Sequence, residues 1–181
     1  MEDYCSRPLT LMLVSGFIAS RHFLLFRAAS DGNERLARIV IMLGASVNLR
    51  ESEGETPLMY AAVAAHSNVL QLLMERGADV NAVSKNGETA LGRAAYVGET
   101  ETVKALIQYG ADIERGGNYG TTPLMYASSQ GYLSTVHLLI EKGAKIDARD
   151  KDGKTALSYA LSQNASREVI NELTRAGAEP N

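Results

Sequence analysis

The chain is poor in cysteine and histidine, with one cysteine, Cys5, and three histidines in 181 residues. A single cysteine excludes an internal disulfide and any metal site built from several thiolates. His22, His66 and His137 lie far apart in the sequence, and none has a partner at the spacing that metal ligands require. We therefore expect no metal and no cofactor, and a lone cysteine fits a reducing compartment.

The chain also lacks an excess of positive charge. Its 18 lysine and arginine residues are set against 21 aspartate and glutamate residues, for a net charge of −3. Because proteins that bind nucleic acids usually carry a basic face, this balance argues against a nucleic acid as the main partner. The hydrophobic content of 45% is ordinary for a globular chain, and the length fits about one domain.

Sequence motifs of common catalytic sites are missing as well. Ser15 and Ser158 lack the Gly-x-Ser-x-Gly frame that exposes a hydrolase nucleophile. Residues 116–120 (GGNYG) are rich in glycine, but the Lys-Ser/Thr pair of a phosphate-binding loop does not follow them. We predict that the protein is not an enzyme and has no catalytic residues.

The apolar stretch near the N-terminus, Leu9–Ala19, is too short for a membrane-spanning helix, which takes about 20 residues. It has the length of a secretory signal, but Glu2 and Asp3 oppose the positive flank that a signal carries. We interpret residues 1–19 as an N-terminal apolar segment that forms a cap helix, and we expect a cytoplasmic protein with no membrane span. Export is the alternative, if residues 9–19 belong to a signal peptide.

What the chain does have is an internal repeat. A Gly-Ala pair recurs every 33 residues, at positions 44, 77, 110 and 143, and a second glycine series keeps the same step, at positions 54, 87, 120 and 153. Two interleaved series of four copies indicate one supersecondary unit stacked on copies of itself. Such an array favours a binding surface over a catalytic pocket. The predicted repeats span about residues 20–50, 51–83, 84–116, 117–149 and 150–181.

Each position of the unit has a physical role. A threonine is predicted to cap each first helix, because its hydroxyl accepts a free backbone N–H, and Pro57 follows at the first helical position, where no donor is lost. Val69, Leu72 and Leu73 have helical spacing and form the inner stripe of a second helix. Gly77 is predicted to end that helix in a left-handed conformation. The capping threonines are Thr56, Thr89, Thr122 and Thr155.

The second copy reads GETPLMYAA at residues 54–62 and RGADVN at residues 76–81. With the Val/Leu-rich helix between them, these motifs resemble the ankyrin repeat, and the resemblance extends over about residues 20–181. It implies an all-α solenoid of about five stacked repeats, each a helix–turn–helix plus a β-hairpin finger. It also implies a non-catalytic module that binds a protein partner through its concave face and finger loops.

Two adjacent positions of each first helix follow the Thr-Pro-Leu motif. The family often has a histidine at the first of them, and its absence here predicts that the hydrogen bonds it makes between repeats are absent too. At the second, we predict that tyrosines wedge between adjacent first helices with their hydroxyls at the surface, rather than form a ladder that stacks on a ligand. Met59, Gly92, Met125 and Ser158 hold the first position, and Tyr60, Arg93, Tyr126 and Tyr159 hold the second.

The first repeat is degenerate, with Phe23 and Leu24 in place of Thr-Pro and an apolar excess at residues 41–43. Terminal repeats need a cover for solubility, so we favour the interpretation that residues 9–19 fold over this excess as a cap. The alternative is that it docks a partner. The last repeat is polar, which suits an end that faces solvent.

The resemblance places the partner at the finger tips and at the exposed end of each first helix. Val63, Tyr96 and Val97 are apolar there without belonging to an inner stripe. We predict a hot spot centred on Tyr96 and Tyr119, because aromatic anchors inside a polar rim dominate interfaces. The alternative is that Val63 and Val97 only pack on neighbouring repeats. The full expected protein-binding set is Val63, Lys85, Asn86, Glu88, Tyr96, Val97, Asn118, Tyr119, Thr121, Gln130, Lys151 and Asp152.

Three functions fit a small array of this kind, and a protein interaction module acting as a monomer is our main hypothesis. A stand-alone inhibitor or immunity-type protein, which blocks a target enzyme, is one alternative. An exported effector is the other, and it would require the N-terminal run to be a signal peptide. Tight one-to-one binding with loss of target activity would separate an inhibitor from an adaptor that bridges two proteins.

Overall fold

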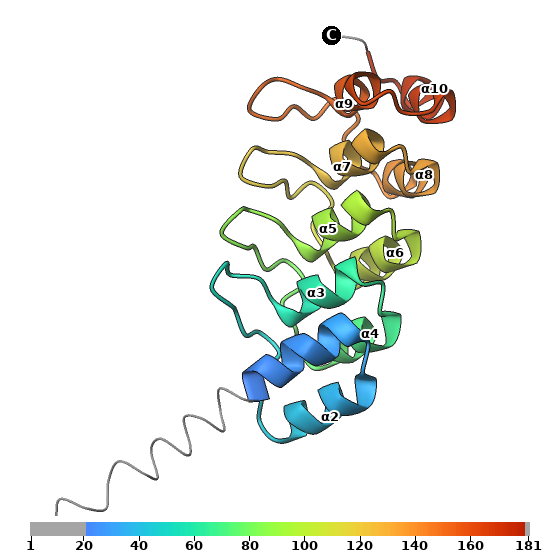
Figure 1. The fold of residues 1–181 in the computed structure, drawn as a ribbon. Coiled ribbons are helices and arrows are strands. Elements are labelled where there is room, and N and C mark those ends of the chain that lie inside the picture. The colour runs from blue at the N-terminus through green and yellow to red at the C-terminus, as the bar shows by residue number, and fades with distance from the viewer. Residues whose placement is uncertain (1–20, 180–181) are drawn as a thin grey trace, which may run out of the picture.

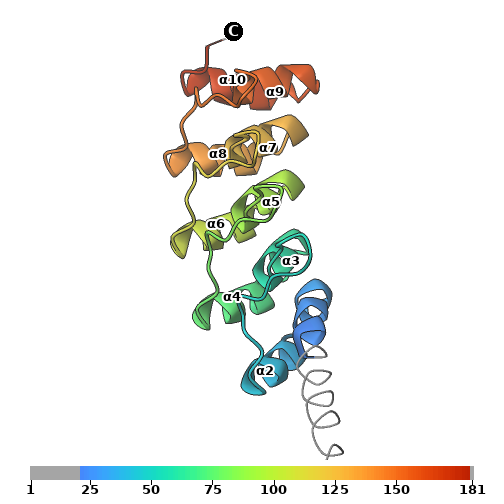
Figure 2. The ribbon, with the colours of Figure 1, turned by 90° about the vertical axis from the view of Figure 1, so that its left-hand side faces the viewer.

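The computed structural model describes residues 21–179. The cap helix or signal peptide expected within residues 1–19 lies outside the described residues. Helix pairs stack one above another in the order of the sequence, and the loops that join successive pairs project on the same side of the stack (Figure 1). A view at a right angle to the first shows the same single file of pairs (Figure 2).

Residues 21–179 hold five pairs of helices and no strand, which confirms the all-α prediction. Each finger closes as a tight turn without a strand ladder. In residues 84–88, for example, the Ser84 N–H donates to Glu88 O and the Gly87 N–H donates to Ser84 O, both at 2.9 Å. The pairs are residues 21–31 with α2 (Glu34–Met42), α3 (Pro57–Val63) with α4 (Ser67–Glu75), α5 (Ala90–Val97) with α6 (Thr100–Gln108), α7 (Pro123–Gln130) with α8 (Leu133–Glu141), and α9 (Ala156–Ser162) with α10 (Arg167–Arg175).

The first helices of the second to fifth repeats begin at the predicted threonines. The Thr89 hydroxyl accepts a hydrogen bond from the Gly92 N–H at 3.0 Å, and the other three threonines accept the equivalent bond. Pro57 stands in the first turn of α3, as predicted, and Pro123 stands in the first turn of α7. Because the caps fix where each helix starts, they also fix which side chains face the fingers.

Left-handed residues end the helices. Gly77 follows α4 with φ of 81°, as predicted. Gly98 and Gly131 end α5 and α7 at 79° and 78°. The equivalent residue after α3 is Ala65, whose φ of 58° carries a conformational strain that glycine avoids.

The core lies between the two helices of each pair and between neighbouring pairs. Val69, Leu72 and Leu73 form the predicted inner stripe of α4 and are at most 1% exposed. Leu106 in α6 and Leu139 in α8 repeat the position of Leu73 and are fully buried. Helices of this length do not persist alone in water, so the core that neighbours share supplies the stability.

Hydrogen bonds also join the loops of successive repeats. The Asn48 side chain donates to Gly77 O at 3.1 Å and accepts from the Asp79 N–H at 2.7 Å. Asn81 makes the equivalent two bonds to the third repeat, at 3.0 and 2.8 Å. These bonds fix the offset between successive repeats, and with it the spacing of the fingers.

The two ends of the described stack differ in polarity. At the N-terminal end, Phe23 is 66% exposed, and Met42, within the apolar excess predicted at residues 41–43, is 81% exposed. At the C-terminal end, α10 buries Val169 and Leu173 and exposes mainly polar side chains.

Candidate functional site

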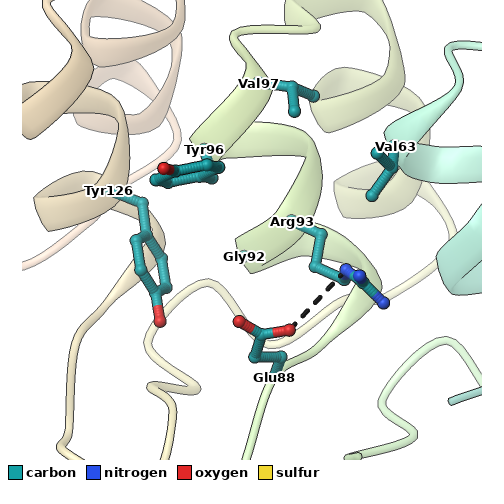
Figure 3. A pocket seen from close by; sticks show the side chains of 7 residues that line it. All are labelled: Val63, Glu88, Gly92, Arg93, Tyr96, Val97 and Tyr126. Atoms are coloured by element: carbon teal, nitrogen blue, oxygen red, sulfur yellow. Dashed lines mark ion pairs between the residues drawn. The ribbon is translucent and has the colours of Figure 1, made fainter.

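A hollow of about 420 Å³ lies where first helices and finger loops meet, on what we call the finger-side face. Helices α3, α5 and α7 supply most of its lining, and the finger that precedes α5 supplies Glu88. In the view of Figure 3, the rings of Tyr96 and Tyr126 lie on one side of Arg93 and Val63 lies on the other. The lining residues are Val63, Glu88, Gly92, Arg93, Tyr96, Val97 and Tyr126.

Two departures from the repeat pattern make room for this hollow. Position 92 is glycine, whereas Met59 and Met125 at the equivalent positions are buried side chains. A Cβ on Gly92 would lie 3.5 Å from the Tyr126 ring, so a longer side chain would enter the space beside that ring. Position 93 is arginine instead of tyrosine, and Arg93 turns towards carboxylates of the fingers.

The aromatic part of the lining is held in a defined orientation. Tyr96 meets Tyr126 edge to face, with the ring centroids 5.9 Å apart and the ring planes at 88°. This geometry is a favoured one for aromatic pairs. Tyr96 is nevertheless 51% exposed and Val63 is 38% exposed, so the hollow offers apolar surface to solvent.

Arg93 lies between two carboxylates. Its Nη1 is 2.6 Å from Glu55 Oε1, and its Nε is 3.6 Å from Glu88 Oε2, the pair drawn with a dashed line in Figure 3. The short contact to Glu55 is also the more buried one, since the side chains of Arg93 and Glu55 are 24% and 15% exposed. Glu88 therefore holds Arg93 more loosely than Glu55 does.

The ion pair continues into a network of finger carboxylates. Burial acts to raise the pKa of Glu55, but the hydrogen bond with Glu51 and the charge of Arg93 outweigh it, so the pKa of Glu55 lies below its usual value. The Tyr60 hydroxyl donates to Glu51 Oε1 at 2.6 Å, and this bond, followed by burial, raises the pKa of Tyr60. With Glu88, the network joins three carboxylates to the one guanidinium of Arg93.

A second hollow, of about 550 Å³, adjoins the first. The two share Glu88 and Tyr126, which separate them. Tyr119 is 73% exposed on its lining, and apart from Tyr126 the other members are polar or charged. Together the two hollows extend from α3 to the finger that precedes α9. The lining residues of the second hollow are Asn86, Glu88, Asn118, Tyr119, Tyr126 and Lys151.

The tyrosine that separates the hollows differs from its equivalents. The Tyr159 hydroxyl donates to Asp150, nine residues earlier, at 2.7 Å. The equivalent residue before Tyr126 is Gly117, which has no side chain to accept such a bond. Burial, and after it the charge of Glu88, raises the pKa of Tyr126. Tyr126 shares a side-chain hydrogen bond with Thr121 and lines both hollows.

The structure brings most of the expected binding residues to these two hollows. Thr121 differs, because it is only 8% exposed and its side chain offers little to a partner. Lys85, Gln130 and Asp152 are exposed but line neither hollow. Of the expected set, Val63, Glu88, Tyr96 and Val97 line the first hollow, and Asn86, Glu88, Asn118, Tyr119 and Lys151 line the second.

Three lining residues are absent from the set that the sequence predicts: Gly92, Arg93 and Tyr126. Gly92 and Arg93 stand out in the sequence as departures from the pattern, but the resemblance links the departure at position 92 only to the loss of hydrogen bonds between repeats. The feature of the sequence that could have revealed the hollow is the change in side chains at these two positions. A glycine replaces a buried methionine, and an arginine replaces a half-buried tyrosine.

Metal sites and membrane spans are not found within residues 21–179. In that range, no group of three histidine, cysteine, aspartate or glutamate side chains is placed to hold a metal ion. Nor does any helix in the described part of the chain have the length and apolar character needed to cross a membrane.

Comparison with known proteins agrees with the geometry. The family model described as "Ankyrin repeats (3 copies)" matches three overlapping stretches, residues 11–84, 64–150 and 116–181. Together the matches run from residue 11 to the last residue of the chain. No curated protein matches the chain.

Proposed function

The chain belongs to the ankyrin repeat family, and on that premise we propose that it is a non-catalytic module that holds a protein partner on its finger-side face. Ankyrin repeats generally mediate protein–protein interaction. The proposal assigns this role to one particular surface, the two adjoining hollows and the side chains around them.

One observation carries the proposal: the hollows are lined by exposed aromatic side chains that take no part in the core of the stack. Tyr96 and Tyr119 are 51% and 73% exposed, while the core is made by a separate set of buried residues. Polar finger residues such as Asn86 and Asn118 surround them. Aromatic anchors within a polar rim are the composition of a protein interface.

The frame around these side chains supports docking without a large rearrangement. Caps fix the first helices, and Asn118 Nδ2 donates to Lys85 O at 2.7 Å, which links two neighbouring fingers. The Lys151 N–H likewise donates to Tyr119 O at 2.9 Å. A surface that is already ordered loses less conformational entropy on binding, so more of the contact energy appears as affinity.

Affinity capture from the native extract, read by mass spectrometry, tests the proposal. The wild type is compared with a Tyr96→Ala/Tyr119→Ala double variant, and with Tyr109→Ala as a control. Tyr109 is 45% exposed at the end of α6, on the second-helix side of the stack. Circular dichroism and an unfolding curve establish that all three chains are folded.

We expect a protein that the wild type and the Tyr109 variant retain and the double variant loses. Equal retention by the double variant would overturn the assignment to the finger-side face. If the captured protein is an enzyme and loses its activity in a one-to-one complex, the module acts as an inhibitor. If it remains active and a second protein is retained with it, the module acts as an adaptor.

A further inference from the structure

The first hollow differs from the rest of the finger-side face in combining apolar walls with a loosely held carboxylate. We propose that it is a subsite for one lysine or arginine side chain of the protein partner, with the stem against Val63, Val97 and Tyr96 and the charged head at Glu88. This inference rests on the proposed function and specifies the chemistry that the partner presents.

The size and walls of the hollow fit such a side chain. Its volume of about 420 Å³ falls within the range of roughly 300–1,000 Å³ in which proteins hold small ligands. Lysine and arginine carry a long methylene stem that packs on apolar surface while the head remains polar. The faces of Tyr96 and Tyr126 also attract a cation that lies over them.

The charges select a cation over an anion. Glu88 Oε2 is 3.6 Å from Arg93, whereas Glu55 engages the same guanidinium at 2.6 Å. A carboxylate accepts several hydrogen bonds, so Glu88 can accept further donors beside its long contact. The charged residues that line the hollow are Glu88 and Arg93, and Arg93 is already paired with Glu55, so an acidic side chain would meet the charge of Glu88 without an uncommitted cation. A wholly apolar side chain would remove water from Glu88 and give it no donor in return.

The neighbouring hollow lacks this combination. It shares Glu88 but adds Lys151, for which, unlike Arg93, the described residues supply no ion pair, so the positive charge of Lys151 opposes a second cation there. No side chain from positions 92 and 93 fills the first hollow beside Glu88, because Gly92 has none and Arg93 points towards Glu55. Both the space and the negative charge for a basic side chain therefore coincide on the α5 side of Glu88.

A displayed library of random linear peptides, selected on the full chain, tests the subsite with ligands of defined sequence. Binders are kept when they fail to bind the Tyr96→Ala/Tyr119→Ala variant. Each is then synthesised with its basic residues replaced one at a time by norleucine, which keeps the stem and removes the charge. Affinities for the wild type, Glu88→Gln and Glu53→Gln are measured by calorimetry. Glu53 is an exposed finger residue that does not line the hollow, so it is the matched control.

We expect one basic position at which norleucine weakens binding to the wild type by about tenfold or more, the usual size for a hydrogen bond to a charged group. Glu88→Gln should weaken the original peptide similarly and should leave the norleucine peptide almost unaffected, because the two changes remove the same interaction. Glu53→Gln should change the affinity by less than about twofold, as expected of an exposed charge.

Peptides that depend on Tyr96 and Tyr119 but tolerate norleucine at every basic position would overturn the subsite and leave the proposed function intact. Losses from norleucine and from Glu88→Gln that simply add would also overturn it, because the two groups would then act separately. A selection in which every binder retains full affinity for the tyrosine variant would contradict the proposed function itself.

Discussion

Helices α5 and α7 share a scaffold and present different surfaces. Each has eight residues, follows a capping threonine and ends at a left-handed glycine. On the exposed side, α5 carries Tyr96 and Val97 where α7 carries Ser129 and Gln130. At the helix start, α5 has a glycine and an arginine where α7 has Met125 and a tyrosine.

The positions that build the stack are therefore separate from those that shape the finger-side face. The caps, the helix ends and the buried leucines are the same in both repeats, so the backbone frame is the same. The hollow results from side chains at positions 92 and 93 that the frame does not require. Changes in one set should therefore alter stability, and changes in the other should alter binding.

The largest expected effect is on the shared core. Leu106→Ala and Leu139→Ala each remove a fully buried leucine at the same position of successive repeats. Each should lower the free energy of unfolding by roughly 2–5 kcal/mol, because the cavity adds to the lost burial. Urea unfolding followed by circular dichroism measures both. A loss below about 1 kcal/mol at one position alone would show that the two repeats do not share a scaffold.

A smaller effect should distinguish the glycines that end the two helices. A Cβ on Gly131 would meet no atom within 4 Å, whereas a Cβ on Gly98 would lie 2.6 Å from the Tyr132 ring. Gly131→Ala should cost roughly 1–2 kcal/mol, the strain of a left-handed alanine, and Gly98→Ala should cost more, because Tyr132 must also move. Ala65 already occupies the equivalent position after α3, so both variants should fold.

The same urea unfolding curves test this ranking. Equal losses for the two glycine variants would contradict it, because the structure then would not place Tyr132 against Gly98. Tyr132→Ala provides the control background. In that background Gly98→Ala should cost only as much as Gly131→Ala costs in the wild type, because the ring that the new methyl group would meet is gone.

Much of the scaffold could be predicted from the sequence because its determinants are local. The threonine caps, the inner stripe of α4 and the left-handed Gly77 each depend on neighbours within one helix. The first hollow depends instead on what three successive repeats place opposite one another. The absence of a side chain at Gly92 matters because the Tyr126 ring of the next repeat lies opposite it, and the sequence around the glycine does not show this neighbour.

The expected binding set shows the same division. The place of Tyr96 and Tyr119 in the repeat predicts both as binding residues, and the structure puts them in separate hollows on either side of Tyr126. Alignment with Glu55 and Glu88 predicts Thr121 at a finger tip, but its side chain is buried. Alignment gives the position of a residue along a finger, whereas packing decides which way its side chain turns.

The smallest expected effect concerns pH and the second helices. His137 in α8 lies 2.7 Å from Glu172 in α10, from Nδ1 to Oε1, where the equivalent residue in α6 is Lys104. The hydrogen bond with Glu172, and then its charge, raises the pKa of His137 above the usual value of about 6.5. The stability from this pair is therefore fully present below about pH 6.5 and is lost as the pH rises through the raised pKa.

Unfolding curves at about pH 5.5 and pH 8.5, for the wild type and Glu172→Gln, measure this small effect. The wild type should lose slightly more stability between the two values than the variant, because the variant lacks the charged partner. The same pH dependence in both chains would contradict the assigned pair.

The role of the first hollow in binding is tested most directly by a chain in which α5 carries the α7 residues, with Gly92→Met and Arg93→Tyr together. Calorimetry would measure its affinity for the partner that the finger-side face retains, and urea would measure its stability. We predict a folded chain whose unfolding free energy falls by roughly 1–3 kcal/mol, because α7 accommodates both residues but Glu55 loses Arg93, and an affinity lower by about tenfold or more. A folded variant that binds the partner as tightly as the wild type would contradict the claim that this hollow is the binding surface.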